Sequence, residues 1–112
     1  MPEKSIAHAP EHSRYELKLD GQIVGVADYK QDGNVRSFTH TGVEPAHRGQ
    51  GLAAELIDFA LRETQETGLE VLPYCWYVRD HIAAHPEYTE LVPAARWAGF
   101  GLGGQSTKAQ EA

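Results

Sequence analysis

Residues 48–53, Arg-Gly-Gln-Gly-Leu-Ala, are the segment of this chain best suited to bind a ligand. They follow a strand-like stretch that ends near Val43, and they open a stretch with the apolar spacing of a helix. A glycine-rich turn before a helix leaves backbone amides without acceptors, and the helix dipole adds partial positive charge there. Both features suit a pyrophosphate group, to which Arg48 could add two parallel hydrogen bonds.

This turn has other interpretations. The dinucleotide fingerprint G-x-G-x-x-G is absent, and no Gly-Lys-Ser/Thr follows as in a P-loop. A glycine-rich connection without any ligand and a small site for nucleotide phosphates both stay open as alternatives.

Cys75 and His40 are the candidate catalytic residues. Cys75 follows a short apolar run and precedes a predicted helix, so its thiol could act as a nucleophile or could line a pocket inertly. His40 lies near the end of another predicted strand. An imidazole titrates near neutral pH, so His40 is either a general base or an exposed histidine at a strand end.

His81 and His85 come nearest to a metal-ligand pattern, since they are four residues apart on a predicted helix. A third ligand is not evident, and Pro86 interrupts the helix directly after His85. The sequence therefore predicts no metal.

The first half of the chain predicts an antiparallel meander. Residues 14–19 alternate apolar and polar side chains, and Asp20-Gly21 offers a two-residue hairpin turn. Residues 22–29 predict a second strand and residues 35–41 a third, with a turn cluster between them.

The second half predicts a β-α-β crossover and a C-terminal helix. Residues 52–67 have one apolar face and predict a helix that Gly68 ends. Residues 69–74 predict a fourth strand, which should run parallel to the third because a helix connects the two. Residues 76–84 predict a second helix, and residues 87–92 a further helical turn. The fold class is α/β (α+β).

Composition limits the partners of this protein. The 112 residues carry a net charge of −6 without any Lys/Arg run, which argues against nucleic acid. The sequence has no apolar stretch long enough to cross a membrane and no visible signal peptide, and its single cysteine excludes an internal disulfide. We expect a cytoplasmic protein with a flexible N-terminus over 1–12, one domain over 13–98 and a flexible tail over 99–112. So small a chain leaves room for a homodimer whose partner subunit completes the site.

Two motifs resemble a known family. Residues 48–53 match the Arg/Gln-x-x-Gly-x-Gly/Ala motif of the GNAT N-acetyltransferases. More narrowly, the chain resembles small single-domain GNAT-like proteins that carry His-Thr-x-Val-x-Pro-x-x-Arg-Gly and, after the next strand, Cys-Trp-Tyr. Here these motifs are residues 40–49 and 75–77, and the resemblance covers about residues 13 to 93.

The resemblance implies a minimal GNAT fold that uses acetyl-CoA as co-substrate, without a metal, to acetylate an amine such as a lysine side chain or a polyamine. It places the cofactor at the backbone of Val43 and at Arg48, Gly49, Gln50, Gly51, Leu52 and Ala53. It also places Cys75 near the thioester, in a gap between two parting strands, where its thiol could accept the acetyl group. A tyrosine often supplies the acid in this family, so the resemblance makes Tyr74 and Tyr77 candidates, although core packing is the favoured role for both. Many relatives have glutamate where this chain has Gly42, so a carboxylate base is not carried over. A non-catalytic CoA-binding or protein-interaction module of the same fold is the alternative.

Overall fold

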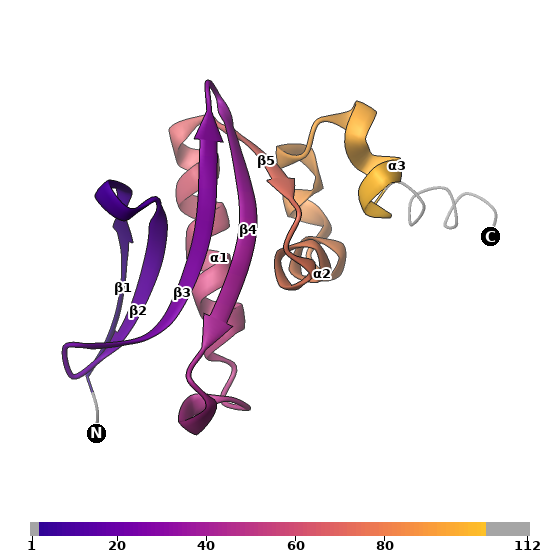
Figure 1. Ribbon diagram of the computed structural model, residues 1–112. Helices are drawn as coiled ribbons and strands as arrows, with labels where there is room; N and C mark the ends of the chain where they lie inside the picture. The colour runs from indigo at the N-terminus through magenta and orange to yellow at the C-terminus, as the bar shows by residue number, and fades with distance from the viewer. Residues whose placement is uncertain (1–2, 103–112) are drawn as a thin grey trace.

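Alternating apolar side chains along the first half of the chain build most of a five-stranded sheet (Figure 1). The computed structural model describes residues 3–102. The strands lie in the order β1-β2-β3-β4-β5; their bounds are Lys4–Ala9, Arg14–Leu19, Gln22–Asp32, Val35–Val43 and Glu70–Pro73. The first four are antiparallel neighbours, whereas β4 and β5 run parallel. This mixed α/β fold and the parallel final pair are as the sequence predicts.

Helix α1, Leu52–Thr67, forms the crossover from β4 to β5. It ends at Gly68, whose φ of 82° lies in the left-handed region that glycine adopts without strain. The amide of Gly68 donates to Gln65 O at 3.0 Å and that of Leu69 to Thr64 O at 3.2 Å, which satisfies two carbonyls of the last helical turn.

Strands β4 and β5 part before β4 ends. Their register runs from Val35 opposite Glu70 to Phe38 opposite Pro73, and the amide of Cys75 makes the last contact, 2.9 Å from Phe38 O. The chain then enters α2, Trp76–Ala84, while β4 continues to Val43 with no further strand beside it on that side among residues 3–102. The sheet therefore opens along the last residues of β4.

A bulge in β4 sets which side chains face which side. Phe38 pairs with Tyr29 and His40 pairs with Asp28, so Thr39 is an extra residue on β4. Phe38 and Thr41 are consequently buried on the side of α1, whereas His40 is exposed on the other side.

Helices α1 and α2 cover one face of the sheet, and α1 lies behind β3 and β4 in Figure 1. Leu56, Ile57 and Leu61 of α1 pack with Val78 and Ile82 of α2 and with the inward side chains of the strands. No described element stands in front of β2, β3 and β4 in that view. We call this uncovered side, which carries Arg14, Glu16, Asp28, Lys30 and His40, the outer face.

A polar network links the sheet to α1. The Arg36 guanidinium is buried, contacts the hydroxyl of Tyr15 and lies 3.3 Å from a Glu63 carboxylate oxygen. His8 stacks on the Tyr15 ring with 4.4 Å between centroids and places Nδ1 3.2 Å from Glu63. Burial and the hydrogen bond to Glu63 raise the pKa of Tyr15, so this phenol stays protonated as a donor.

The predicted flexible N-terminus is wrong for residues 4–9. They form β1, which pairs with β2 from Lys4 opposite Leu19 to Ala9 opposite Arg14. The sequence gives little sign of this strand, because its inward positions are Ile6 and His8. The histidine belongs inside only because Tyr15 and Glu63 lie there.

The predicted C-terminal tail begins too early. Trp97–Phe100 form the short helix α3, and Leu102 is buried in the core. Phe100 packs edge-on against Tyr74, with 5.4 Å between ring centroids. The rest of the predicted tail, residues 103–112, lies outside the described residues.

Candidate functional site

A pocket of about 480 Å³ lies where β4 has lost its neighbour, bounded by α1 and α2. Its walls come from the end of β4, the turn after it, the first turns of α1 and one side of α2. The lining residues are Thr41, Gly42, Val43, His47, Arg48, Gly49, Gly51, Leu52, Ala53, Ala54, Ile57, Tyr77, Asp80 and His81. Six of the seven residues predicted to bind a cofactor line this pocket; the exception, Gln50, is exposed beside it.

The glycine turn leaves its backbone amides without partners. Gly49 and Gly51 have φ values of 82° and 78°, and a Cβ at either would meet nothing within 4 Å. The first bond of α1 runs from Glu55 N to Gly51 O at 3.2 Å. Within residues 3–102, the amides from Gly49 to Ala54 donate to no protein acceptor. A row of amides at a helix N-terminus is the arrangement that binds an anionic group.

Arg48 links this turn to β4. Its Nε donates to Val43 O at 3.0 Å, while the terminal nitrogens Nη1 and Nη2 make no hydrogen bond within the described part of the chain. The side chain is exposed at the rim of the pocket. Arg48 lines the same pocket as Gly49 and Gly51, and its terminal nitrogens remain available as donors there.

The backbone of Val43 points into the pocket. The amide of Glu44 donates to Val24 O at 2.8 Å, so Gly25 and Val43 are a non-hydrogen-bonded pair of the antiparallel ladder. The amide and carbonyl of Val43 therefore point away from β3, toward the side that β5 has left. A ligand chain lying there could pair with β4 as another strand would.

Cys75 lies behind the pocket wall. Its side chain is 7% exposed, and Sγ lies 3.5 Å from the hydroxyl of Thr41, which lines the pocket. Tyr77, two residues after Cys75 and in the first turn of α2, lines the pocket. Tyr74 instead is exposed, and its hydroxyl accepts a hydrogen bond from Arg96 at 3.0 Å. Of the two tyrosines considered as acids, only Tyr77 lies at the pocket.

The structure does not bring His40 and Cys75 together. Thr41 and Cys75 are buried on the side of α1, whereas His40 is exposed on the outer face. The His40 ring lies over Gly42, such that a Cβ built on Gly42 would be 3.1 Å from Nε2 of His40. His40 therefore occupies the space that a side chain at position 42 would need.

Sequence reasoning missed the role of His81 in the pocket. Its Nε2 lies 3.1 Å from Oδ1 of Asp58, which also accepts from the Tyr88 hydroxyl at 2.7 Å. Burial raises the pKa of Asp58, but hydrogen bonds from Tyr88, Arg62 and His81 outweigh it and bring the value to about 2. The four-residue spacing of Tyr77 and His81 could have placed both on one face of the helix. The contact of His81 with Asp58 of α1 has no signal in the sequence.

His81 and His85 do not converge on a common point as metal ligands would. Nδ1 of His85 bonds the His81 carbonyl at 2.9 Å, and His81 points to Asp58. Across residues 3–102, no three His, Cys, Asp or Glu side chains are grouped as a metal site. No helix in the same range is long and apolar enough to cross a membrane.

Residues 14–91 match the family of GCN5-related N-acetyl-transferases, and the chain belongs to this family. No curated protein sequence matches it. Among solved structures it is similar to the ribosomal-protein-S18-alanine N-acetyltransferase of Escherichia coli, with a TM-score of 0.51 and 17% identity over 57% of this chain. A ribosomal-protein-alanine N-acetyltransferase from Brucella melitensis biovar Abortus 2308 gives a TM-score of 0.48 and 23% identity over 75% of this chain.

The family match confirms the family that the sequence predicts, and the similarity to the Escherichia coli structure confirms the fold. The chain spans 42% of the length of the first structure and 65% of the second. The names of those two enzymes specify alanine of a ribosomal protein as the group that they acetylate, and this substrate is stated of those two proteins alone.

Proposed function

We propose that this protein binds acetyl-CoA and transfers the acetyl group to an amine. The observation that carries the proposal is the row of amides from Gly49 to Ala54 that have no acceptor among the described residues, in a pocket that Arg48 also lines. A diphosphate would satisfy several of these donors at once. One helix terminus supplies only about 0.3–1 kcal/mol toward an anion, so the amides and the guanidinium must act together.

The end of β4 would hold the remainder of the ligand. The Val43 amide points into the pocket, and the adjoining pocket walls are the apolar side chains of Leu52, Ala53 and Ile57. A pantetheine arm, an extended chain with amide groups, suits a wall of this kind. Anchoring both of its ends would present the thioester near Thr41 in a fixed place, which lowers the entropic cost of reaction.

Two routes for the acetyl group are consistent with this arrangement. In the direct route, an amine attacks the thioester, and His40, whose ring occupies the space beside Gly42, takes the amine's proton. In the covalent route, Cys75 first accepts the acetyl group. The direct route is favoured because Cys75 is buried behind Thr41, where an acceptor has little access.

A CoA-binding module without turnover is the second candidate function. It is favoured by the positions of the two candidate catalytic residues: Cys75 is buried behind Thr41, and His40 lies on the outer face and does not line the pocket. Release of CoA from acetyl-CoA, measured with and without a panel of amines, distinguishes the two. Amine-dependent release supports the enzyme, whereas tight CoA binding without release supports the module.

Calorimetric titration of CoA into the wild-type protein and Arg48→Ala tests the binding site directly. Loss of charge-assisted hydrogen bonds to phosphate should weaken binding about tenfold, and raised salt should weaken the wild type as well. Lys30→Ala is the matched control, since it removes one positive charge from the outer face. Equal affinities for Arg48→Ala and Lys30→Ala would contradict a phosphate contact at the turn.

A cytoplasmic location and a homodimer stay predictions from the sequence. Sedimentation of the full chain at several concentrations, with and without CoA, would test the dimer.

A further inference from the structure

Asp28 is a carboxylate without a partner. It is half-buried on β3, and its oxygens make no hydrogen bond or ion pair with any residue from 3 to 102. Its cross-strand partner on β2 is Arg14, whose Nε instead donates to a Glu16 carboxylate oxygen at 2.8 Å. The Asp28 oxygens reach solvent. This carboxylate is therefore available to pair with a cation that approaches the outer face.

His40 is the neighbour of Asp28 on the other side. The two residues are opposite each other in the register of β3 and β4, and both face outward. Side chains opposite each other on antiparallel strands have Cβ atoms about 5 Å apart, close enough for one small group to touch both. The His40 ring is held over Gly42, so it leans along β4 toward the open end of that strand.

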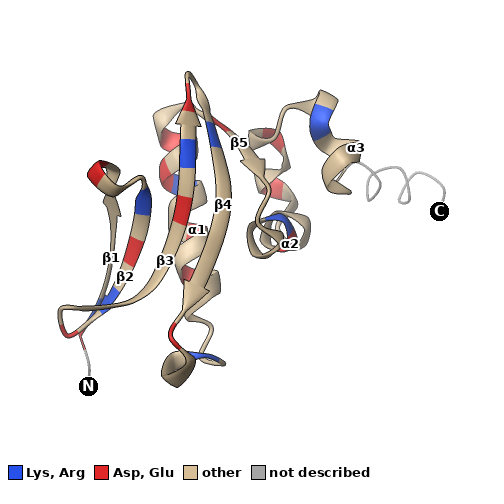
Figure 2. Ribbon diagram, viewed as in Figure 1, with Lys and Arg blue, Asp and Glu red and all other residues tan. Residues whose placement is uncertain are grey.

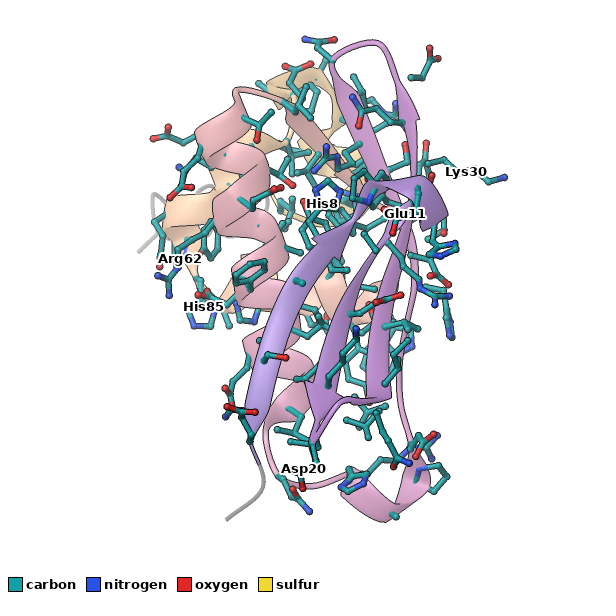
Figure 3. All side chains as sticks on the ribbon, turned by 90° about the vertical axis from the view of Figure 1, so that its left-hand side faces the viewer. His8, Glu11, Asp20, Lys30, Arg62 and His85 are labelled. Carbon is teal, nitrogen blue, oxygen red and sulfur yellow. The ribbon has the colours of Figure 1, made fainter. Side chains whose placement is uncertain are left out.

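Among the described residues, Asp28 is the carboxylate directly opposite His40 in the register of β3 and β4. Figure 2 shows charged residues of both signs along β2 and β3, while β4 from Phe38 to Val43 carries none. Lys30 shares the outer face, but its side chain extends away from the sheet into solvent (Figure 3). A cation held beside His40 would therefore lie next to the Asp28 carboxylate.

This constellation lies directly across β4 from the pocket. Thr41, the next residue after His40, points inward, lines the pocket and contacts Cys75. Strand β5 has ended at this level, so the edge of β4 is open. A group held beside His40 on the outer face and a group held beside Thr41 in the pocket would meet at this open edge.

We propose that Asp28 and His40 form an acceptor subsite on the outer face, and that the acceptor is a primary alkylamine that arrives as its ammonium ion. The inference rests on the proposed function, because it assumes a thioester in the pocket. Asp28 holds the ammonium group, and His40 takes one of its protons and passes it to water. The nitrogen lone pair then attacks the thioester carbonyl carbon. The new N–C bond forms, the C–S bond breaks, and the departing thiolate takes the second amine proton.

Steady-state kinetics of acetyl-CoA with two amines test this subsite. The probes are 1,4-diaminobutane and Nα-acetyl-lysine amide, which separate a small polyamine from a lysine side chain as the source of the ammonium group. Asp28→Asn should raise the KM for the preferred amine about tenfold, with a smaller change in kcat and an unchanged Kd for CoA. His40→Gln should instead lower kcat and flatten its pH profile.

Asp32→Asn is the matched control, because Asp32 is an exposed carboxylate at the far end of β3. If CoA binds but Asp28→Asn behaves like Asp32→Asn, the acceptor subsite is wrong while the proposed CoA site stands. If CoA does not bind at all, the proposed function itself fails. If neither amine reacts with acetyl-CoA or binds the CoA-loaded protein, the inference is rejected. The same holds if His40→Gln keeps the wild-type kcat.

Discussion

Replacing Gly51 by alanine separates the backbone conformation of the turn from its role in binding. Gly51 has a φ of 78°, and a Cβ there would meet nothing within 4 Å, so the only penalty in the folded state is conformational. Holding an alanine in the left-handed region costs about 1–2 kcal/mol. Gly68 is the matched control, since its φ is 82° and its Cβ position is equally open.

Both variants should lose about 1–2 kcal/mol of unfolding free energy. With a urea m-value of roughly 1–2 kcal/mol/M for a domain of this size, the midpoint should fall by about 1 M. Only Gly51→Ala should also lose affinity for CoA. The strain is partly relieved when φ at position 51 relaxes, which turns that amide away from the pocket. Binding has to restore the strained φ, so we expect Kd to rise about tenfold.

Urea unfolding followed by circular dichroism gives the stability of each variant, and calorimetry gives the Kd of those that remain folded. If Gly51→Ala is as destabilised as Gly68→Ala but binds CoA with wild-type affinity, the amides of this turn are not the anion site. If Gly68→Ala loses affinity to the same extent, the effect reflects general stability and the reasoning from the turn fails.

Three further outcomes follow from other contacts. The pKa of Asp58 is lowered from 3.8 to about 2, so the ionised carboxylate stabilises the folded state by about 2 kcal/mol. This contribution is complete above pH 4 and is lost as the pH falls toward 2. The unfolding curves of Asp58→Asn and wild type should therefore differ at pH 7 and converge near pH 2. In Gly42→Ala, the new Cβ 3.1 Å from Nε2 of His40 should displace that ring and lower kcat without changing the Kd for CoA, and an unchanged kcat would remove His40 as the base. If Cys75 is an acyl carrier, mass spectrometry after mixing with acetyl-CoA should show one acetyl group on it, which Cys75→Ala abolishes together with turnover; the direct route predicts turnover without this adduct.

Local sequence signals located most of the candidate site. The turn residues Gly49 and Gly51 could be identified because a left-handed φ is a property of a single residue, and glycine tolerates it. The bounds of α1 followed in the same way from its apolar face and from Gly68. The parallel pairing of β4 and β5 followed from the connecting helix.

Signals that depend on distant residues were not accessible. Strand β1 lacks a clear alternating pattern because its inward histidine, His8, is satisfied by Tyr15 and Glu63. The contact between His81 and Asp58 joins two helices, and neither helical segment contains a sequence pattern that predicts it.

The amino-acid sequence alone determined that a glycine turn follows a strand and opens a helix, because turn geometry and helix periodicity are set by neighbours along the chain. Tertiary structure alone decided where the side chains around that turn point. A single extra residue, Thr39, rotates the end of β4, which turns Thr41 toward the pocket and leaves His40 beside Asp28 on the outer face. That bulge is a property of the pairing between β3 and β4, so it could emerge only once the two strands were placed side by side.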